Sequence, residues 1–214
     1  TEFVHCSIDL APTQAARARA APTATAARLC WAPDSSYECP AVDRHFLNPL
    51  FVPQSIVVFA GDPDAETAPT PMAATLRRQL KEGGYVGQTT WLDIEMTGTL
   101  ADLAHSRADL ALIALPAEQM KAAMEIVGRI RCRAALILST ALPPALCNEL
   151  HQIARRYGVN LLGPNSLGFQ RPQLKLNASA LGPLAMPGQL GLVSQSGALT
   201  ASILDWAQHN GVGF

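Results

Sequence analysis

Two short segments in the last third of the chain carry small, hydroxyl and amide residues that suit anion binding. Residues 163–168 read GPNSLG, and residues 194–199 read SQSGAL. Each follows a short apolar run, 159–162 and 190–193, which predicts a strand that ends in a ligand-binding loop. In the first loop Gly163 permits backbone shapes closed to other residues. The Asn165 amide can donate and accept hydrogen bonds, or it can stabilise its own turn as an Asx-turn.

The second segment leads into a predicted helix that ends near Gly211. Leu199, Ile203 and Trp206 recur at spacings of three and four residues, the period of one helix face. Backbone N–H groups and the helix dipole at such an N-terminus favour a phosphate or a carboxylate. The candidate phosphate-facing residues are Ser194, Gln195, Ser196 and Gly197. An ordinary N-cap, formed by either serine hydroxyl, would use the same residues.

Hydrophobic patterning from residue 55 onward predicts an α/β fold, a Rossmann-like parallel sheet covered by helices on both faces. Short β-branched or leucine-rich runs alternate with longer helical ones. The expected strands lie near 55–59, 88–92, 109–115, 134–138 and 159–162. The expected helices lie near 71–82, 118–130 and 144–157, with a short turn near 99–104.

Ligands of such sheets bind beyond the carboxyl ends of the strands, so the loops there supply the other candidate residues. They are Gly61 and Asp62 after the first strand, Pro116 and Ala117 after the third, and Ser139 and Thr140 after the fourth. Pro116 could expose backbone groups to a ligand, or it could form a plain strand-to-helix turn. Asp93 follows the second strand, where a dinucleotide-binding fold has a ribose-binding acid, but GxGxxG is absent.

Composition excludes several classes of protein. The chain has 214 residues, 49% of them hydrophobic, and a net charge of −1, which indicates neither a nucleic-acid nor an anionic-membrane partner. It has no apolar run long enough to span a membrane. The five cysteines form no CxxC pair, so we expect free thiols in a reducing cytoplasm and no metal site. Residues 1–45, rich in Ala, Thr and Pro, indicate a linker or arm.

The GPNSLG and SQSGAL segments resemble NDP-forming acyl-CoA synthetases, relatives of the succinyl-CoA ligase alpha subunit. Residues 50–58 (LFVPQSIVV) and 111–117 (ALIALPA) extend the resemblance, so that it covers residues 46–214. It implies a CoA-binding Rossmann-like domain over residues 46–185. Residues 186–214 would begin a second, flavodoxin-like domain, cut short, whose SQSGAL loop faces the phosphate at the active site. CoA contacts from the Ser139–Thr140 turn are plausible by the same resemblance.

The resemblance also implies what the chain would need from elsewhere. The whole enzyme would convert a carboxylic acid, CoA and a nucleoside triphosphate into acyl-CoA, nucleoside diphosphate and phosphate, and such proteins sometimes carry an appended acetyltransferase domain. None of the five histidines lies in a loop like the family's phosphohistidine loop. That loop, the ATP-grasp domain, ATP and magnesium would belong to further domains or to a partner subunit. The chain would therefore bind CoA or acyl-CoA without catalytic residues of its own, in a homo-oligomer.

The loop after the first strand leaves a second hypothesis open. The family has a GAS turn and a later glycine there, whereas this chain has Ala60-Gly61-Asp62 and then Asp64 and Glu66. Carboxylates repel a pyrophosphate group, which places CoA binding in question. The alternative is a non-catalytic module for nucleotide sensing or protein interaction.

Overall fold

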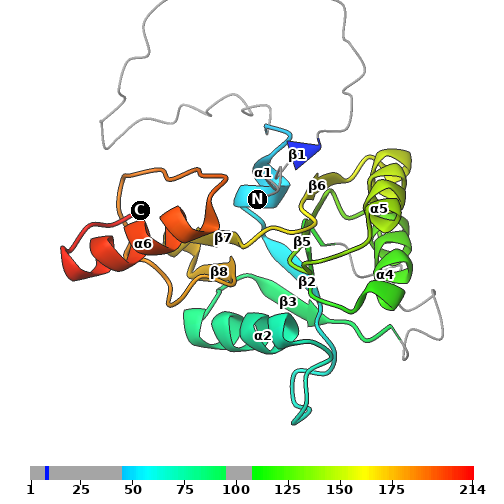
Figure 1. Ribbon diagram of the computed structural model, residues 1–214, viewed down its shortest axis with the longest axis horizontal. Coiled ribbons are helices and arrows are strands. Elements are labelled where there is room, and N and C mark those ends of the chain that lie inside the picture. The colour runs from blue at the N-terminus through cyan, green and yellow to red at the C-terminus, as the bar shows by residue number, and fades with distance from the viewer. Residues whose placement is uncertain (1–7, 10–44, 95–107) are drawn as a thin grey trace, which may run out of the picture.

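A six-stranded sheet with five parallel strands forms the centre of the chain (Figure 1). The computed structural model describes residues 8–9, 45–94 and 108–214. The strand order is β1-β6-β5-β4-β2-β3, and β1 pairs antiparallel with β6 at one edge. The strands are β1 (Ile8–Asp9), β2 (Ser55–Phe59), β3 (Gln88–Trp91), β4 (Leu110–Ile113), β5 (Ala134–Ile137) and β6 (Asn160–Leu162).

Two helices cover one face of the sheet, and two further helices with a hairpin cover the other (Figure 1). On the first face lie α4 (Ala117–Arg129) and α5 (Pro144–Tyr157). On the second lie α1 (Asn48–Phe51), α2 (Pro71–Gly83) and the hairpin of β7 (Gly168–Arg171) and β8 (Leu176–Ser179), joined by η1 (Pro172–Leu174). The helix α6 (Gly197–His209) follows the hairpin.

Alternate residues of the central strands supply the two apolar cores. Val57 and Ile113 pack with Met120 and Met124 of α4. On the other face the strands pack with Leu76 of α2 and with β8. Strands that are buried on both faces explain why their sequences read as continuous apolar runs.

The predicted α/β class and parallel sheet are confirmed. Each predicted strand from 55 to 162 and each of the helices 71–82, 118–130 and 144–157 is present within a few residues of its expected bounds. The turn expected near 99–104 lies outside the described residues. The expected arm contributes one short strand, β1, at the edge of the sheet.

The strand expected at 190–193 is wrong. These residues have no regular secondary structure, and Leu190 and Val193 are 57% and 96% exposed. An apolar run forms a strand only where a neighbouring strand accepts its hydrogen bonds, and 190–193 pairs with no strand in the described part of the chain. The β7–β8 hairpin was not predicted.

The connections divide between β2 and β4. From β2 the chain passes through α2 on one face to the edge strand β3, whereas from β4 it passes through α4 on the other face to β5. Ligands of open α/β sheets bind where the connections diverge in this way, outside the carboxyl ends of the strands. The fold therefore directs attention to the loops that follow β2, β4, β5 and β6.

Candidate functional site

The loop after β2 is fastened by an arginine that sequence reasoning missed. Arg77 of α2 donates from Nε to the Ala60 carbonyl oxygen at 2.8 Å and from Nη1 to the Ala65 and Thr67 carbonyl oxygens at 3.4 Å. Gly61 has φ +72°, and a Cβ there would lie 2.6 Å from Arg77 Nη2. The left-handed conformation favours glycine at position 61, and a side chain there would displace the Arg77 guanidinium.

The acidic side chains of this loop are directed to solvent. Asp62, Asp64 and Glu66 are exposed, and Asp62 Oδ1 accepts a hydrogen bond from the Asp64 backbone N–H at 3.0 Å. In bulk water two unit charges about 4 Å apart interact by only about 1 kcal/mol. The carboxylates therefore oppose a nearby phosphate weakly, and the Arg77 guanidinium under the loop offsets part of their charge.

The β2 loop is also linked to the end of β4. Thr70, the N-cap of α2, accepts a hydrogen bond from the Ala73 backbone N–H at 3.0 Å and donates one to the Ala114 carbonyl oxygen at 3.1 Å. Pro116 occupies the N-cap position of α4, Ala117 is the first residue of that helix, and the Pro116 carbonyl accepts from Gln119 N–H at 3.1 Å. Pro116 and Ala117 thus form a strand-to-helix turn at the mouth of the sheet.

Ser139 joins the ends of three strands. It is 7% exposed, and its hydroxyl donates to the Leu115 carbonyl oxygen at 2.7 Å. Its own carbonyl oxygen accepts from Asn165 N–H at 3.1 Å. Ser139 therefore positions the loops after β4 and β6, while its neighbour Thr140 is exposed to solvent.

The GPNSLG loop presents Asn165 to solvent. Asn165 adopts a left-handed conformation, φ +62°, and within the described residues its exposed amide makes no hydrogen bond. The turn is held instead by Ser166, whose hydroxyl accepts from Gly168 N–H at 3.0 Å. Gly163 has φ +93°, and a Cβ there would collide with the Ile137 carbonyl oxygen. His151 Nε2, a neighbour that the sequence did not indicate, lies 3.4 Å from the Gly163 carbonyl oxygen.

The N-terminus of α6 packs against this loop. Ser196 is the N-cap, with its hydroxyl accepting from Leu199 N–H at 3.3 Å, and Ser194 Oγ accepts from Ser196 N–H at 3.0 Å. A Cβ on Gly197 would collide with the Leu167 side chain, so glycine allows the two segments to meet. Gln195 is exposed beside them. The GPNSLG and SQSGAL segments, separate in the sequence, are thus adjacent in space.

Contacts join all of these loops into one row along the carboxyl edge of the sheet. Arg77 and Thr70 link the ends of β2 and β4, Ser139 links the ends of β4, β5 and β6, and Leu167 links the last loop to α6. Such an edge offers backbone groups, hydroxyls and an amide for a polar, elongated ligand. Among the described residues no group of three or more His, Cys, Asp or Glu is arranged to hold a metal ion. No described helix is long and apolar enough to cross a membrane.

Thr70 and Arg77 were not predicted as residues of the site, although the sequence contains a weak indication of each. Thr70 precedes Pro71, the combination typical of a helix start. Arg77 lies four residues after buried Ala73 and next to buried Leu76, so a charge interrupts the apolar stripe of α2. Interruption of such a stripe indicates a side chain with an internal partner.

Known ligases are similar to this chain in sequence and in fold. Over 112 residues the chain is 38% identical to acetate–CoA ligase [ADP-forming] I of Archaeoglobus fulgidus, a match that covers 50% of this chain and 16% of the relative. Over 178 residues it is 30% identical to acetate–CoA ligase [ADP-forming] I subunit alpha of Pyrococcus furiosus, covering 75% of this chain and 37% of that subunit. No protein-family model matches the chain.

Solved structures agree with the sequence matches. The dinucleotide-forming acetyl-coenzyme A synthetase 1 of Ca. Korarchaeum cryptofilum, in complex with phosphate and ADP, superposes with a TM-score of 0.66 at 24% identity. The match covers 78% of this chain and 38% of that one, and at this identity it shows the fold. The similarity to NDP-forming acyl-CoA synthetases predicted from the sequence is confirmed. The particular relatives matched are ADP-forming acetate–CoA ligases, and the chain spans well under half of their length.

Proposed function

We propose that this chain is the CoA-binding portion of an NDP-forming acyl-CoA synthetase. The observation that carries the proposal is the unbroken row of linked loops at the carboxyl edge of the sheet, in a chain whose relatives are CoA ligases. The whole enzyme would join a carboxylic acid to CoA at the expense of a nucleoside triphosphate. The chain's own task is to bind CoA or acyl-CoA and to hold it for reaction.

The residues of the row have different parts in this proposal. Asn165 and Thr140, both exposed, contact CoA through an amide and a hydroxyl. Gly61 and the Pro116–Ala117 turn offer backbone close to the ligand, with Asp62 at the rim. Ser139 and Gly163 act through position, because one is consumed by internal hydrogen bonds and the other admits no side chain. The thiol that CoA supplies would be the nucleophile of the complete enzyme.

The second half of the proposal concerns the segment after residue 185. Residues 46–185 form the CoA-binding domain, and residues 186–214 begin the next domain, whose Ser194–Gly197 loop faces the phosphate of the complete active site. The exposed side chains of Leu199 and Trp206, at 54% and 58%, suit burial against further protein. ATP, magnesium and the phosphohistidine belong to that protein, and the assembly is a homo-oligomer in the cytoplasm.

Thermal unfolding with and without CoA tests the proposal through two matched variants. Asn165→Gly removes the amide at a position whose φ of +62° glycine adopts without strain, and Lys175→Gly makes the same backbone change at φ +54° in the β7–β8 turn. CoA at about 100 times Kd stabilises a protein by about 2.7 kcal/mol. We expect Lys175→Gly to retain this stabilisation and Asn165→Gly to lose about 0.5–1.5 kcal/mol of it, the worth of one neutral hydrogen bond. Equal stabilisation of both variants would remove Asn165 from the site.

A non-catalytic sensing or interaction module is the second candidate, because three exposed carboxylates surround the first loop. In that case CoA stabilises none of the proteins, including the wild type, while the fold itself remains intact. Replacing Asp62, Asp64 and Glu66 by their amides separates the two functions. If the acids only weaken CoA binding, the triple amide variant binds CoA more tightly than the wild type.

A further inference from the structure

An open cavity lined by exposed arginine side chains lies at the end of the sheet opposite the proposed CoA site. It has a volume of about 530 Å³ and is lined by four arginines, Arg129, Arg131, Arg133 and Arg156, beside Tyr157. These residues lie where α4 and α5 end and the chain turns into β5 and β6. The cavity is therefore at the amino ends of the strands and open to solvent.

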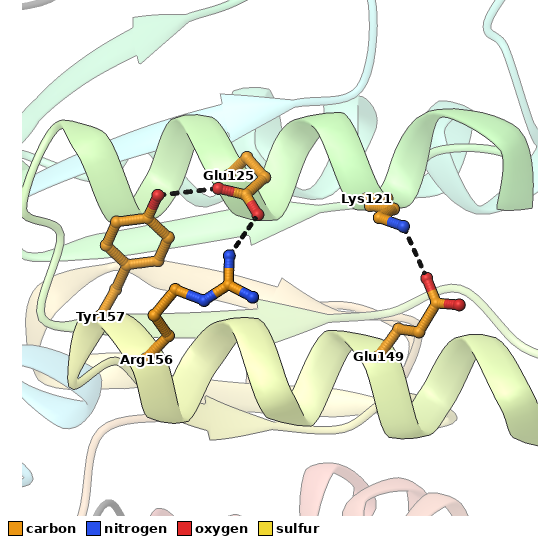
Figure 2. A network of polar contacts seen from close by, with 5 residues as sticks. All are labelled: Lys121, Glu125, Glu149, Arg156 and Tyr157. Carbon is orange, nitrogen blue, oxygen red and sulfur yellow. Dashed lines mark hydrogen bonds and ion pairs between the residues drawn. The ribbon is translucent and has the colours of Figure 1, made fainter.

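The positive charge of this cavity is poorly neutralised. Arg156 Nη1 lies 3.3 Å from Glu125 Oε1, and the Tyr157 hydroxyl donates to Glu125 Oε2 at 2.8 Å (Figure 2). Another ion pair between these helices, Lys121 with Glu149, lies further along them (Figure 2). In the described part of the chain, Arg129, Arg131 and Arg133 have no ion pair.

Helix stabilisation accounts for only part of this cluster. The C-terminal ends of α4 and α5 each carry about half a negative charge, which arginines in the last turn offset. Subtracting these, Glu125 and Asp109, whose carboxylate acts on the Cys132 thiol, from four guanidinium groups leaves a surplus of about one positive charge. Arg131 and Arg133 lie outside the helices, and Arg131 adopts φ +57°, a conformation in which glycine would be favoured.

The remaining walls of the cavity fix its shape. The Tyr157 ring packs on Gly128, where a Cβ would collide with it. Cys132 is buried, with its thiol donating to the Ala134 carbonyl oxygen at 3.3 Å, and burial raises its pKa to about 12. The thiol is therefore neutral at physiological pH and adds no negative charge to the cavity.

We propose that this arginine cavity binds a small ligand with two or more phosphate groups. Guanidinium groups are planar, remain charged and donate paired hydrogen bonds that match phosphate oxygens. Several of them around one cavity favour a ligand with several phosphates over an isolated carboxylate. The site is distinct from the proposed CoA site, and each of the two proposals can be refuted without the other.

Calorimetric titration with inorganic tripolyphosphate tests the site directly. The decisive variant is Arg131→Gly, which removes one guanidinium where the backbone accepts glycine. Lys175→Gly is the matched control, because it removes an exposed positive charge from a left-handed position, φ +54°, between β7 and β8. We expect saturable binding to the wild type, loss of at least about 10-fold in affinity for Arg131→Gly, and less than about a twofold loss for Lys175→Gly.

Three results would overturn the proposal. The first is the absence of saturable heat at millimolar tripolyphosphate. The second is an equal loss of tripolyphosphate affinity in Arg131→Gly and Lys175→Gly. The third is an affinity for acetate equal to that for tripolyphosphate. Retained binding of an acidic peptide without tripolyphosphate binding would assign the surface to a protein partner. ATP in place of tripolyphosphate shows whether a nucleoside adds affinity.

A competition experiment keeps the two sites apart. Saturating tripolyphosphate should leave the CoA affinity of the chain within about twofold, and Asn165→Gly should leave tripolyphosphate binding unchanged. Displacement of tripolyphosphate by CoA in the wild type, abolished by Arg131→Gly, would show that CoA itself occupies the arginine cavity. Because CoA itself carries a pyrophosphate and a 3′-phosphate, that outcome would fit the ligand class proposed for the arginines. It would contradict the proposed CoA site at the carboxyl ends of the strands and the separation of the two sites.

Discussion

Replacement of Ser139 by alanine should weaken the whole carboxyl edge of the sheet. The Ser139 hydroxyl donates to the Leu115 carbonyl oxygen at 2.7 Å, and the two residues are 7% and 4% exposed. The variant loses a buried hydrogen bond and deprives a buried carbonyl of this donor. These effects together cost about 2 kcal/mol.

Unfolding experiments measure this cost against a neighbouring control. In a chain of this length, about 2 kcal/mol lowers Tm by about 4–8 °C. Thr140→Ala, which changes an exposed hydroxyl next in sequence, should shift the free energy of unfolding by less than about 0.5 kcal/mol. Urea titration should show the same difference in midpoint with an unchanged m value. Equal stability of Ser139→Ala and Thr140→Ala would refute the linking role of Ser139.

Three further variants test other parts of the structure. Gly128→Ala should destabilise the chain by about 1–3 kcal/mol in urea, because the new methyl collides with the Tyr157 ring; removing the ring as well should recover part of the loss. The pKa of the Cys132 thiol in the folded chain, about 12, exceeds its usual value near 9. As the pH rises, the unfolded chain therefore loses the thiol proton at a lower pH than the folded chain does. Stability should fall above about pH 9 by up to about 1.4 kcal/mol per pH unit, and Cys132→Ala should flatten that slope relative to the wild type. Arg77→Ala should speed proteolysis within the loop after β2, which Arg77 holds by its carbonyl oxygens; Arg78→Ala, an exposed neighbour, should not.

The sequence predicted the sheet because its strands are buried on both faces and therefore continuously apolar. Strand β2 was predicted with the bounds Ser55–Phe59 that the structure has, and helix α5 likewise with Pro144–Tyr157. In both, local pattern and tertiary environment favour the same structure. The hairpin β7–β8 was missed because its strands, with the sequences GFQR and LNAS, mix apolar and polar residues and contain no continuous apolar run.

Candidate residues were predicted by type, but their partners were not. Position after a strand indicated Ser139 and Asn165 correctly as residues of the carboxyl edge. The Ser139 side chain is hydrogen-bonded in the interior, whereas the Asn165 side chain is exposed. This difference depends on contacts with segments 24 or more residues away. For the same reason the packing of Gly197 on Leu167 could not be predicted from the sequence. The run 190–193 shows the reverse error, since an apolar pattern does not form a strand without a neighbour.

The most direct test of the central claim is calorimetric titration of the wild-type chain with CoA, with ADP and NAD titrated in parallel. At the row of loops we predict saturable binding of CoA, weaker binding of ADP, which carries fewer groups to contact the row, and no binding of NAD. Tight NAD binding at the same site would indicate a different nucleotide-binding protein. No heat at millimolar CoA, from a chain that still unfolds cooperatively, would contradict the assignment of this chain as a CoA-binding domain.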